Sequence, residues 1–111
     1  MDLDRSAFDN LAAEIGREDT LQTFSIFFDD ASDRLLRLRG LCCDSERKAI
    51  AAEAHGLKGS AANFGFARVS ELASKLEQGA PTIKPGDYDA LLRNLETSYA
   101  AARESFAALT A

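Results

Sequence analysis

Long apolar stretches are missing from this sequence of 111 residues. A membrane-spanning helix needs roughly 20 consecutive apolar residues, whereas the most hydrophobic stretch, around Phe24–Phe28, contains a serine and ends at Asp29 and Asp30. We therefore expect no membrane contact. The first residues also lack the basic start and apolar core of a secretory signal. The sequence thus predicts a cytoplasmic protein.

Positive charge and cysteine are scarce as well. Thirteen Lys and Arg residues stand against eighteen Asp and Glu residues, which gives a formal net charge of −5. Proteins that bind nucleic acid present basic faces, so we expect no nucleic-acid partner. The two cysteines, Cys42 and Cys43, are adjacent, a spacing that rarely forms a disulfide and does not resemble a pair of zinc ligands. We therefore expect reduced thiols and no metal site.

Proline is rare, and apolar residues recur at steps of three and four. Both prolines fall within residues 79–87, the only loop of any length that we expect. The apolar spacing is typical of amphipathic helices. It predicts helices over about 4–15, from 19–20 to about 42, from 44–45 to about 64, over about 67–78 and from about 87 onward. Asp19 or Thr20 should cap the second helix, and Asp44 or Ser45 the third.

These segments predict an all-α fold. Four amphipathic helices with short connections pack most simply as an antiparallel up-down four-helix bundle, and the additional short N-terminal helix would cover one end or side. Ile26 lies opposite the apolar stripe of its own helix, so we expect another element to cover it. The length corresponds to a single domain, residues 1–111. A bundle with polar outer faces is most simply a monomer.

The third predicted helix has an unusual outward face. At about 100° per residue, His55 points about 140° away from the apolar side of this helix. A histidine in a bundle is ordinarily a core residue, but this projection places it in solvent. The apolar side consists of Ile50, Ala54, Leu57, Ala61 and Phe64. The outward side is nearly bare of charge and consists of Lys48, Ala51, Ala52, Gly56, Gly59 and Ala62.

Two glycines within this helix each cost about 1 kcal/mol of helix stability relative to alanine. Their presence at positions 56 and 59 indicates that another surface approaches the helix closely, although packing on a neighbouring helix or a kink would also explain them. Lys58 emerges one turn after His55, where its ammonium group could reach an anion on the imidazole; an ordinary solvated lysine is the alternative. Neutral imidazole is a nucleophile, and phosphoryl transfer needs mainly positioning and positive charge. These residues predict a histidine that accepts a phosphoryl group.

The run from Ala54 to Gly65, AHGLKGSAANFG, resembles the signature of histidine-containing phosphotransfer (HPt) domains. Leu76 and Glu77 on the next predicted helix resemble the family's Leu-Glu ending, and residues 24–38 resemble its second helix. Two positions depart from the family pattern. Gly56 stands where a larger residue is usual, and Phe66 where a small residue is common.

The resemblance implies a phosphorelay intermediate without autokinase activity of its own. It implies that His55 accepts a phosphoryl group and exchanges it with aspartates of response-regulator receiver domains. It further implies that Lys58 helps to hold the group and that Gly59 leaves room for the receiver. A sensor histidine kinase would be another partner, and Mg²⁺ is expected on the receiver, so that this chain needs no cofactor. The partner surface is expected to include Lys48, Ala52, Gly56, Gly59 and Ala62.

Other classes of protein fit less well. A helical interaction bundle without chemistry, in which His55 is incidental, is the main alternative, and the bare surface around His55 argues against it. A thiol enzyme with Cys42 or Cys43 as nucleophile and His55 as base would need a third, orienting group and a cleft, and the sequence indicates neither. A histidine kinase would need a glycine-rich nucleotide-binding stretch, which the sequence lacks.

Overall fold

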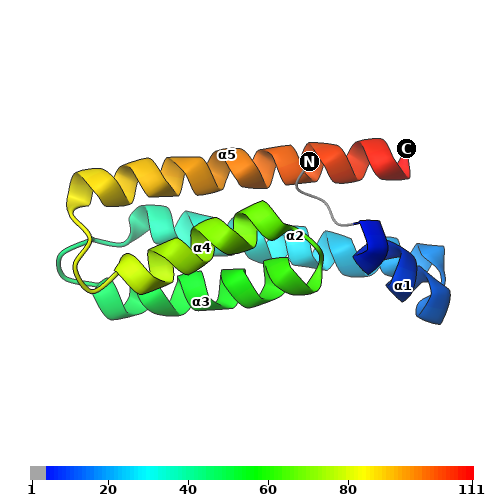
Figure 1. The fold of residues 1–111 in the computed structure, drawn as a ribbon, viewed down its shortest axis with the longest axis horizontal. Helices are drawn as coiled ribbons and strands as arrows, with labels where there is room; N and C mark the ends of the chain where they lie inside the picture. Colours follow the sequence, from blue (N-terminus) through cyan, green and yellow to red (C-terminus); the bar gives the residue numbers. More distant parts are fainter. Residues whose placement is uncertain (1–4) are drawn as a thin grey trace.

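Five helices form an elongated bundle of 45 × 20 × 19 Å in the computed structural model, which describes residues 5–111. The helices are α1 (Arg5–Ile15), α2 (Arg17–Gly40), α3 (Arg47–Asn63), α4 (Ala67–Gly79) and α5 (Pro85–Thr110). Helices α2 to α5 run alternately up and down the long axis, and α1 lies against the N-terminal part of α2 (Figure 1). The predicted all-α bundle with a short N-terminal helix is confirmed. Asp4, the predicted start of the first helix, lies outside the described residues.

The beginning of α2 differs from the prediction. Gly16 adopts a φ of 90°, which turns the chain directly from α1 into α2, so that α2 begins at Arg17. Asp19 and Thr20 therefore lie inside the first turn, and no side chain caps this helix. The Thr20 hydroxyl donates a hydrogen bond to the Gly16 carbonyl instead, at 2.7 Å. A glycine in the left-handed region replaced the side-chain cap that the sequence suggested.

The connection between α2 and α3 corrects two further expectations. Because α2 ends at Gly40, Cys42 lies beyond the helix and is exposed, while Cys43 is the buried cysteine. The N-cap position of α3 is occupied by Glu46, without a side-chain cap from Asp44 or Ser45. The Glu46 carboxylate instead accepts a hydrogen bond from the backbone N–H of Cys42, at 2.8 Å. Both thiols are free.

Helix α5 begins two residues before its predicted start at Asp87. Pro85 occupies the first turn of the helix, after Lys84 in an extended conformation. Proline fits this position because the first N–H groups of a helix have no intrahelical acceptor and its fixed φ is already helical. The proline that suggested a loop thus starts the helix, and the connection from α4 is shorter than expected.

The core near α1 is aromatic. Phe66 is fully buried and stacks on Phe27, with 5.2 Å between ring centroids. It follows Gly65, whose φ of 82° closes the turn between α3 and α4. The large residue at position 66 therefore fills the bundle interior next to this turn. Its cluster contains Phe8, Phe24, Phe27, Phe28, Phe64, Phe66 and Phe106.

Ile26 is 64% exposed, so the prediction that another element covers it is wrong. Helix α1 was the natural candidate for this role. It packs instead on the opposite side of α2, where Phe8 contacts Phe24 with 5.4 Å between ring centroids. Burying Phe8 in the aromatic core removes more apolar surface from water than covering one isoleucine would.

The packing order leaves the outer face of α3 uncovered. Helices α3 and α4 form the most extensive pair, α2 packs on the other side of α3, and α5 packs against α4 and α2. Within residues 5–111, no helix has the length and apolar character needed to cross a membrane. The face of α3 that carries the predicted site is therefore flanked by α2 and α4 and open between them.

Candidate functional site

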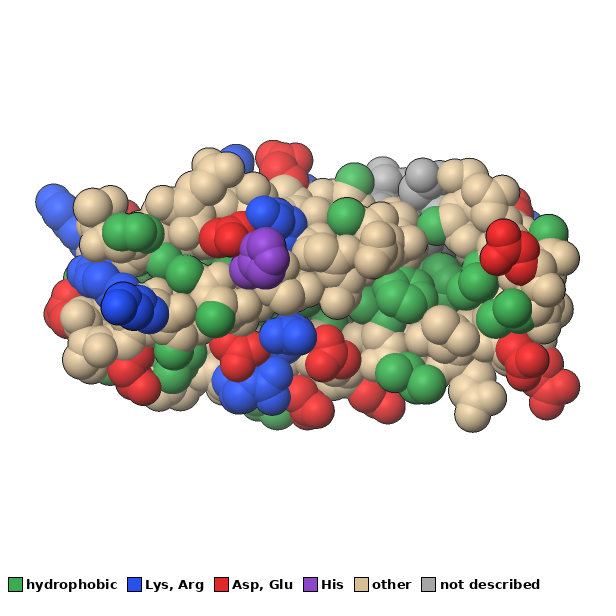
Figure 2. Space-filling model, turned by 90° about the horizontal axis from the view of Figure 1, so that it is seen from below, with side chains coloured by type: hydrophobic (Ala, Val, Ile, Leu, Met, Phe, Trp, Pro, Cys, Tyr) green, Lys and Arg blue, Asp and Glu red, His purple; other side chains and the backbone are tan. Residues whose placement is uncertain are grey.

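The outward position of His55 is confirmed. Its side chain is 69% exposed, whereas Leu57 and Ala61 on the same helix are completely buried. The apolar periodicity of α3 fixes this orientation, because burying Ile50, Ala54, Leu57 and Ala61 turns His55 outward. Figure 2 shows the imidazole in the middle of an open face, with basic and acidic side chains close to it on two sides.

On the α4 side, one carboxylate joins the two residues that the sequence singled out. Glu77 Oε2 lies 2.8 Å from His55 Nδ1, and Glu77 Oε1 accepts a hydrogen bond of 2.6 Å from Lys58 Nζ. The hydrogen bond from Lys58 is the main reason that the pKa of the Glu77 carboxyl lies below its ordinary value; partial burial opposes the shift and His55 adds to it. Glu77 is therefore an anion at neutral pH.

This carboxylate determines which imidazole nitrogen is available for chemistry. An ionised carboxylate only accepts hydrogen bonds, so in neutral His55 the proton resides on Nδ1 and is donated to Glu77. The lone pair is then on Nε2. With the side chain 69% exposed, Nε2 is open to a reactant. The arrangement can deliver a nucleophilic nitrogen in a fixed orientation.

Lys58 is held more firmly than the sequence suggested. Its side chain is 35% exposed and its ammonium group is bonded to Glu77, so it is not simply a solvated lysine. Its backbone carbonyl accepts a hydrogen bond of 3.0 Å from the Ser70 hydroxyl of α4. Both ends of Lys58 are thus tied to α4, within reach of the imidazole.

The two glycines of α3 have different surroundings. A Cβ atom at position 59 would meet no atom within 4 Å, so Gly59 faces open space. A Cβ atom at position 56 would lie 2.5 Å from Cζ of Arg34, a residue of α2. Helix α3 continues through both positions, so neither glycine ends or interrupts it. Gly59 is open to a partner, whereas the space beside Gly56 is taken by an arginine.

On the α2 side, charged residues form a second cluster. Glu53 of α3 accepts hydrogen bonds from Arg34 Nη1, at 3.0 Å, and from Arg37 Nε, at 2.6 Å. Arg34 Nε also donates to Asp30, at 3.0 Å. The bond from Arg37 is the largest cause of the lowered pKa of the Glu53 carboxyl, with Arg34 contributing. This cluster contacts α3 without a hydrogen bond to the imidazole.

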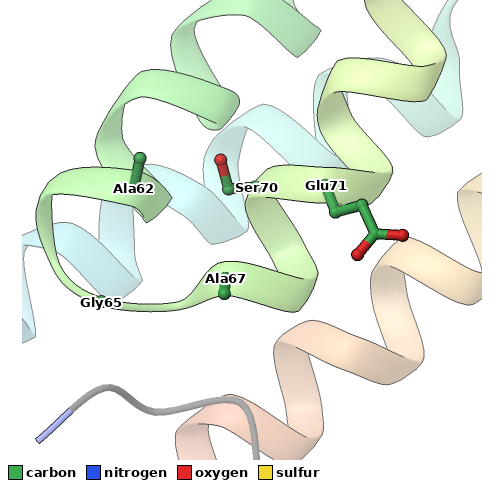
Figure 3. Close-up of a pocket in the computed structure, with 5 residues that line it drawn as sticks. All are labelled: Ala62, Gly65, Ala67, Ser70 and Glu71. Atoms are coloured by element: carbon green, nitrogen blue, oxygen red, sulfur yellow. The ribbon is translucent and has the colours of Figure 1, made fainter.

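The other residues of the expected partner surface lie along α3. Lys48, Ala52 and Ala62 are all exposed. Ala62 borders a shallow hollow at the α3–α4 turn (Figure 3), where Ser70 lines the opposite side and the Glu71 carboxylate points away from both. The hollow is lined by Ala62, Gly65, Ala67, Ser70 and Glu71. The residues expected to contact a partner therefore lie along the exposed side of α3, from Lys48 to Ala62.

Three residues that sequence analysis gave no role contribute to this site. Glu77 appeared only in the family resemblance, and Arg34 and Ser70 not at all, because each acts across a helix pair. Neither cysteine hydrogen-bonds to His55; the Cys43 thiol contacts the Ile83 carbonyl, at 3.3 Å. Within residues 5–111, no group of three or more His, Cys, Asp or Glu side chains is placed to hold a metal ion.

The sequence matches a known protein family. The family model of the Hpt domain matches residues 22–105, a range that includes His55, Lys58 and Glu77. No curated protein and no solved structure gives a match. Hpt domains are carriers in histidine phosphotransfer rather than enzymes in the usual sense. With most of its length matched, the chain belongs to the Hpt domain family of two-component phosphorelays.

Proposed function

We propose that His55 is the phosphoacceptor of this domain and exchanges the phosphoryl group with aspartates of receiver domains. The observation that supports this most directly is the exposed imidazole whose Nδ1 is bonded to Glu77, which leaves Nε2 as a nucleophile facing solvent. The bare surface at Gly59 gives a partner access to this nitrogen.

In the transfer step, Nε2 of His55 attacks the phosphorus of an aspartyl phosphate on the receiver. The new N–P bond forms as the bond from phosphorus to the aspartate oxygen breaks, and the aspartate leaves as a carboxylate. The proton stays on Nδ1, where Glu77 offsets the positive charge that develops on the ring. The reverse reaction returns the group to an aspartate.

Lys58 supplies the positive charge for the phosphoryl oxygens. Its ammonium group is bonded to the same carboxylate as the imidazole, so a small rotation brings it to a group on the ring. Phosphoryl transfer depends mainly on such positioning and charge compensation. The Mg²⁺ that the reaction needs belongs to the receiver. This chain has no autokinase activity and receives its phosphate from a relay that a sensor histidine kinase starts.

The partner surface is the strip formed by Lys48, Ala52, Gly59 and Ala62, with Gly56 beneath Arg34. Small residues let the receiver approach closely, which in-line transfer requires. We propose that this domain acts in the cytoplasm as a monomer.

Transfer from a phosphorylated receiver tests the proposal. A receiver charged with radiolabelled acetyl phosphate is incubated with the wild-type protein and with His55→Gln, and the label on each is measured. We expect label on the wild type only, in an acid-labile and base-stable form. A receiver that binds both proteins without any transfer would instead support the helical interaction bundle.

A further inference from the structure

Arg34 is held across the outer face of α3, at the residue next to His55. Its Nε donates to Asp30 Oδ2 on α2, and its Nη1 donates to Glu53 Oε1 on α3, each at 3.0 Å. The guanidinium then covers Gly56, where a Cβ atom would lie 2.5 Å from Cζ. Any side chain at position 56 would displace the arginine from this place. The absence of a side chain at Gly56, next to the proposed phosphoacceptor, therefore makes room for the guanidinium of Arg34.

One nitrogen of this guanidinium has no acceptor. Among the described residues, Nη2 of Arg34 donates no hydrogen bond, and it would lie 2.8 Å from a Cβ atom at position 56. The Arg34 side chain as a whole is 26% exposed, so solvent or a partner can reach part of it. Two carboxylates already restrict the side chain, and a further bond would cost little conformational entropy. Nη2 is thus a preorganised donor for an oxygen acceptor.

Two acceptors are conceivable, a phosphoryl group on His55 and a group on the partner. The imidazole is bonded to Glu77 of α4, whereas Arg34 is bonded to α2 and to Glu53. Lys58 shares a carboxylate with the imidazole, but no hydrogen bond connects Arg34 to it. Arg34 therefore flanks His55 from the other helix, on the open face. This position favours the partner as the source of the acceptor.

We infer that Arg34 determines partner specificity by binding a carboxylate on the docking surface of the receiver through Nη2. The inference rests on the proposed function of His55. A guanidinium prefers carboxylates because its planar donors match their geometry. A receiver with an apolar or basic residue at this point would bury Nη2 without an acceptor and would be disfavoured.

The rate of transfer from a phosphorylated receiver is measured against receiver concentration for the wild type, Arg34→Ala and Arg37→Ala. Arg37 is the matched control: it also bonds to Glu53, whereas the three atoms nearest to a Cβ atom at position 56 all belong to Arg34. For Arg34→Ala we expect the half-saturating receiver concentration to rise roughly tenfold, as for the loss of a charge-assisted hydrogen bond. The saturated rate and the lifetime of the phosphohistidine without receiver should not change. Arg37→Ala should behave as wild type.

A second variant tests whether Arg34 needs the free space beside Gly56. Gly56→Ala should melt no earlier than wild type, because alanine favours the helix and the displaced group is the end of a flexible side chain. It should nevertheless raise the half-saturating concentration as much as Arg34→Ala does. The double variant Arg34→Ala/Gly56→Ala should show no further rise, since both changes remove the same contact.

Each other outcome overturns the inference in a recognisable way. Absence of transfer to wild-type protein would overturn it together with the function of His55. Transfer with an unchanged half-saturating concentration in Arg34→Ala would overturn the role of Arg34 alone. A shorter phosphohistidine lifetime at unchanged half-saturation would assign Arg34 to the phosphoryl group. An equal rise of the half-saturating concentration in Arg37→Ala would indicate that only the positive charge of this surface matters. Additive rises in the double variant Arg34→Ala/Gly56→Ala would indicate that the alanine at position 56 itself obstructs the receiver.

Discussion

The two sides of His55 are built from similar residues but differ in what they contact. On the α4 side, Glu77 bonds directly to the imidazole and to Lys58. On the α2 side, Glu53 bonds to Arg34 and Arg37, and Arg34 occupies the space beside Gly56 without a hydrogen bond to the imidazole. The α4 side can orient the imidazole and place a positive charge next to it, whereas the α2 side can only shape the surface around it. Ion pairs of similar composition therefore have different expected roles, decided by contact.

The largest expected effect concerns the space that neither side fills. Gly59→Gln should lower the transfer rate on the order of a hundredfold, because in-line geometry tolerates a displacement of only about 1 Å. A Cβ atom there meets nothing within 4 Å, so the variant should fold normally or gain up to about 1 kcal/mol. Gly86→Gln in α5, equally free of neighbours, is the control. Early melting, or transfer at the wild-type rate, would contradict the docking role of Gly59.

Removing the carboxylate on each side separates orientation from surface shape. Glu77→Ala should lower the saturated transfer rate roughly ten- to hundredfold, the range known for loss of carboxylates that orient metal-binding histidines. Glu77→Gln retains an oxygen that can accept from Nδ1 and should recover part of this loss. Glu53→Ala should raise the half-saturating receiver concentration, because Arg34 loses one of its two carboxylate partners, while the saturated rate stays constant. Equal losses of saturated rate in both alanine variants would remove the distinction between the two sides.

Lys58→Ala tests the positive charge of the α4 side. Lys58 is partly exposed, so its ion pair with a phosphoryl group on His55 should contribute about 1 kcal/mol. We therefore expect about a fivefold slower transfer or a shorter phosphohistidine lifetime. The free energy of unfolding should change by no more than about 0.5 kcal/mol. Kinetics of transfer and decay, with thermal melting, provide the check. Unchanged kinetics would make Lys58 only the counter-ion of Glu77.

The smallest effect is the pH dependence of stability. The carboxyl of Glu77 has a pKa below its ordinary value, chiefly through Lys58, and that of Glu53 through Arg37. A carboxyl with a lowered pKa in the folded state stabilises above its unfolded pKa of about 4.3 and loses this contribution as pH falls through the folded pKa. The melting temperatures of wild type and Glu77→Gln should therefore differ at neutral pH and converge in acid.

The same convergence is expected for Glu53→Gln, so this measurement shows what the two sides share. Only Glu77→Gln should also lower the saturated transfer rate at neutral pH. A difference in melting temperature that widens in acid would show that the ionised carboxylates do not stabilise the fold.

Local patterns in the sequence predicted the helices and the exposure of His55, because burying one apolar stripe determines where every other side chain of a helix points. Helix ends were less predictable. Gly16 and Pro85 set them through backbone conformation, against the more usual preference for Asp or Ser caps. The prediction that Ile26 is covered was wrong, because α1 packs on the other side of α2, where Phe8 contacts Phe24.

The contacts around the imidazole were beyond reach of the sequence alone. His55 and Glu77 are 22 positions apart and meet only through the crossing of α3 and α4. Arg34 reaches Gly56 from α2 in the same way. Helical periodicity describes one helix at a time, so it could not indicate which residue of a neighbour would arrive at a given point. It did locate the histidine that these neighbours surround.

The turn between α3 and α4 sets the alignment of the reacting groups from a distance. His55 precedes Gly65 by ten residues, which corresponds to about 15 Å of helix. The aromatic ring of Phe66 anchors the turn in the core and the left-handed Gly65 closes it. One additional residue within α4, between this turn and Glu77, would rotate Glu77 by about 100° about the helix axis and carry its carboxylate away from the ring. The spacing between Phe66 and Glu77, fixed far from the reacting nitrogen, thus helps to orient the imidazole.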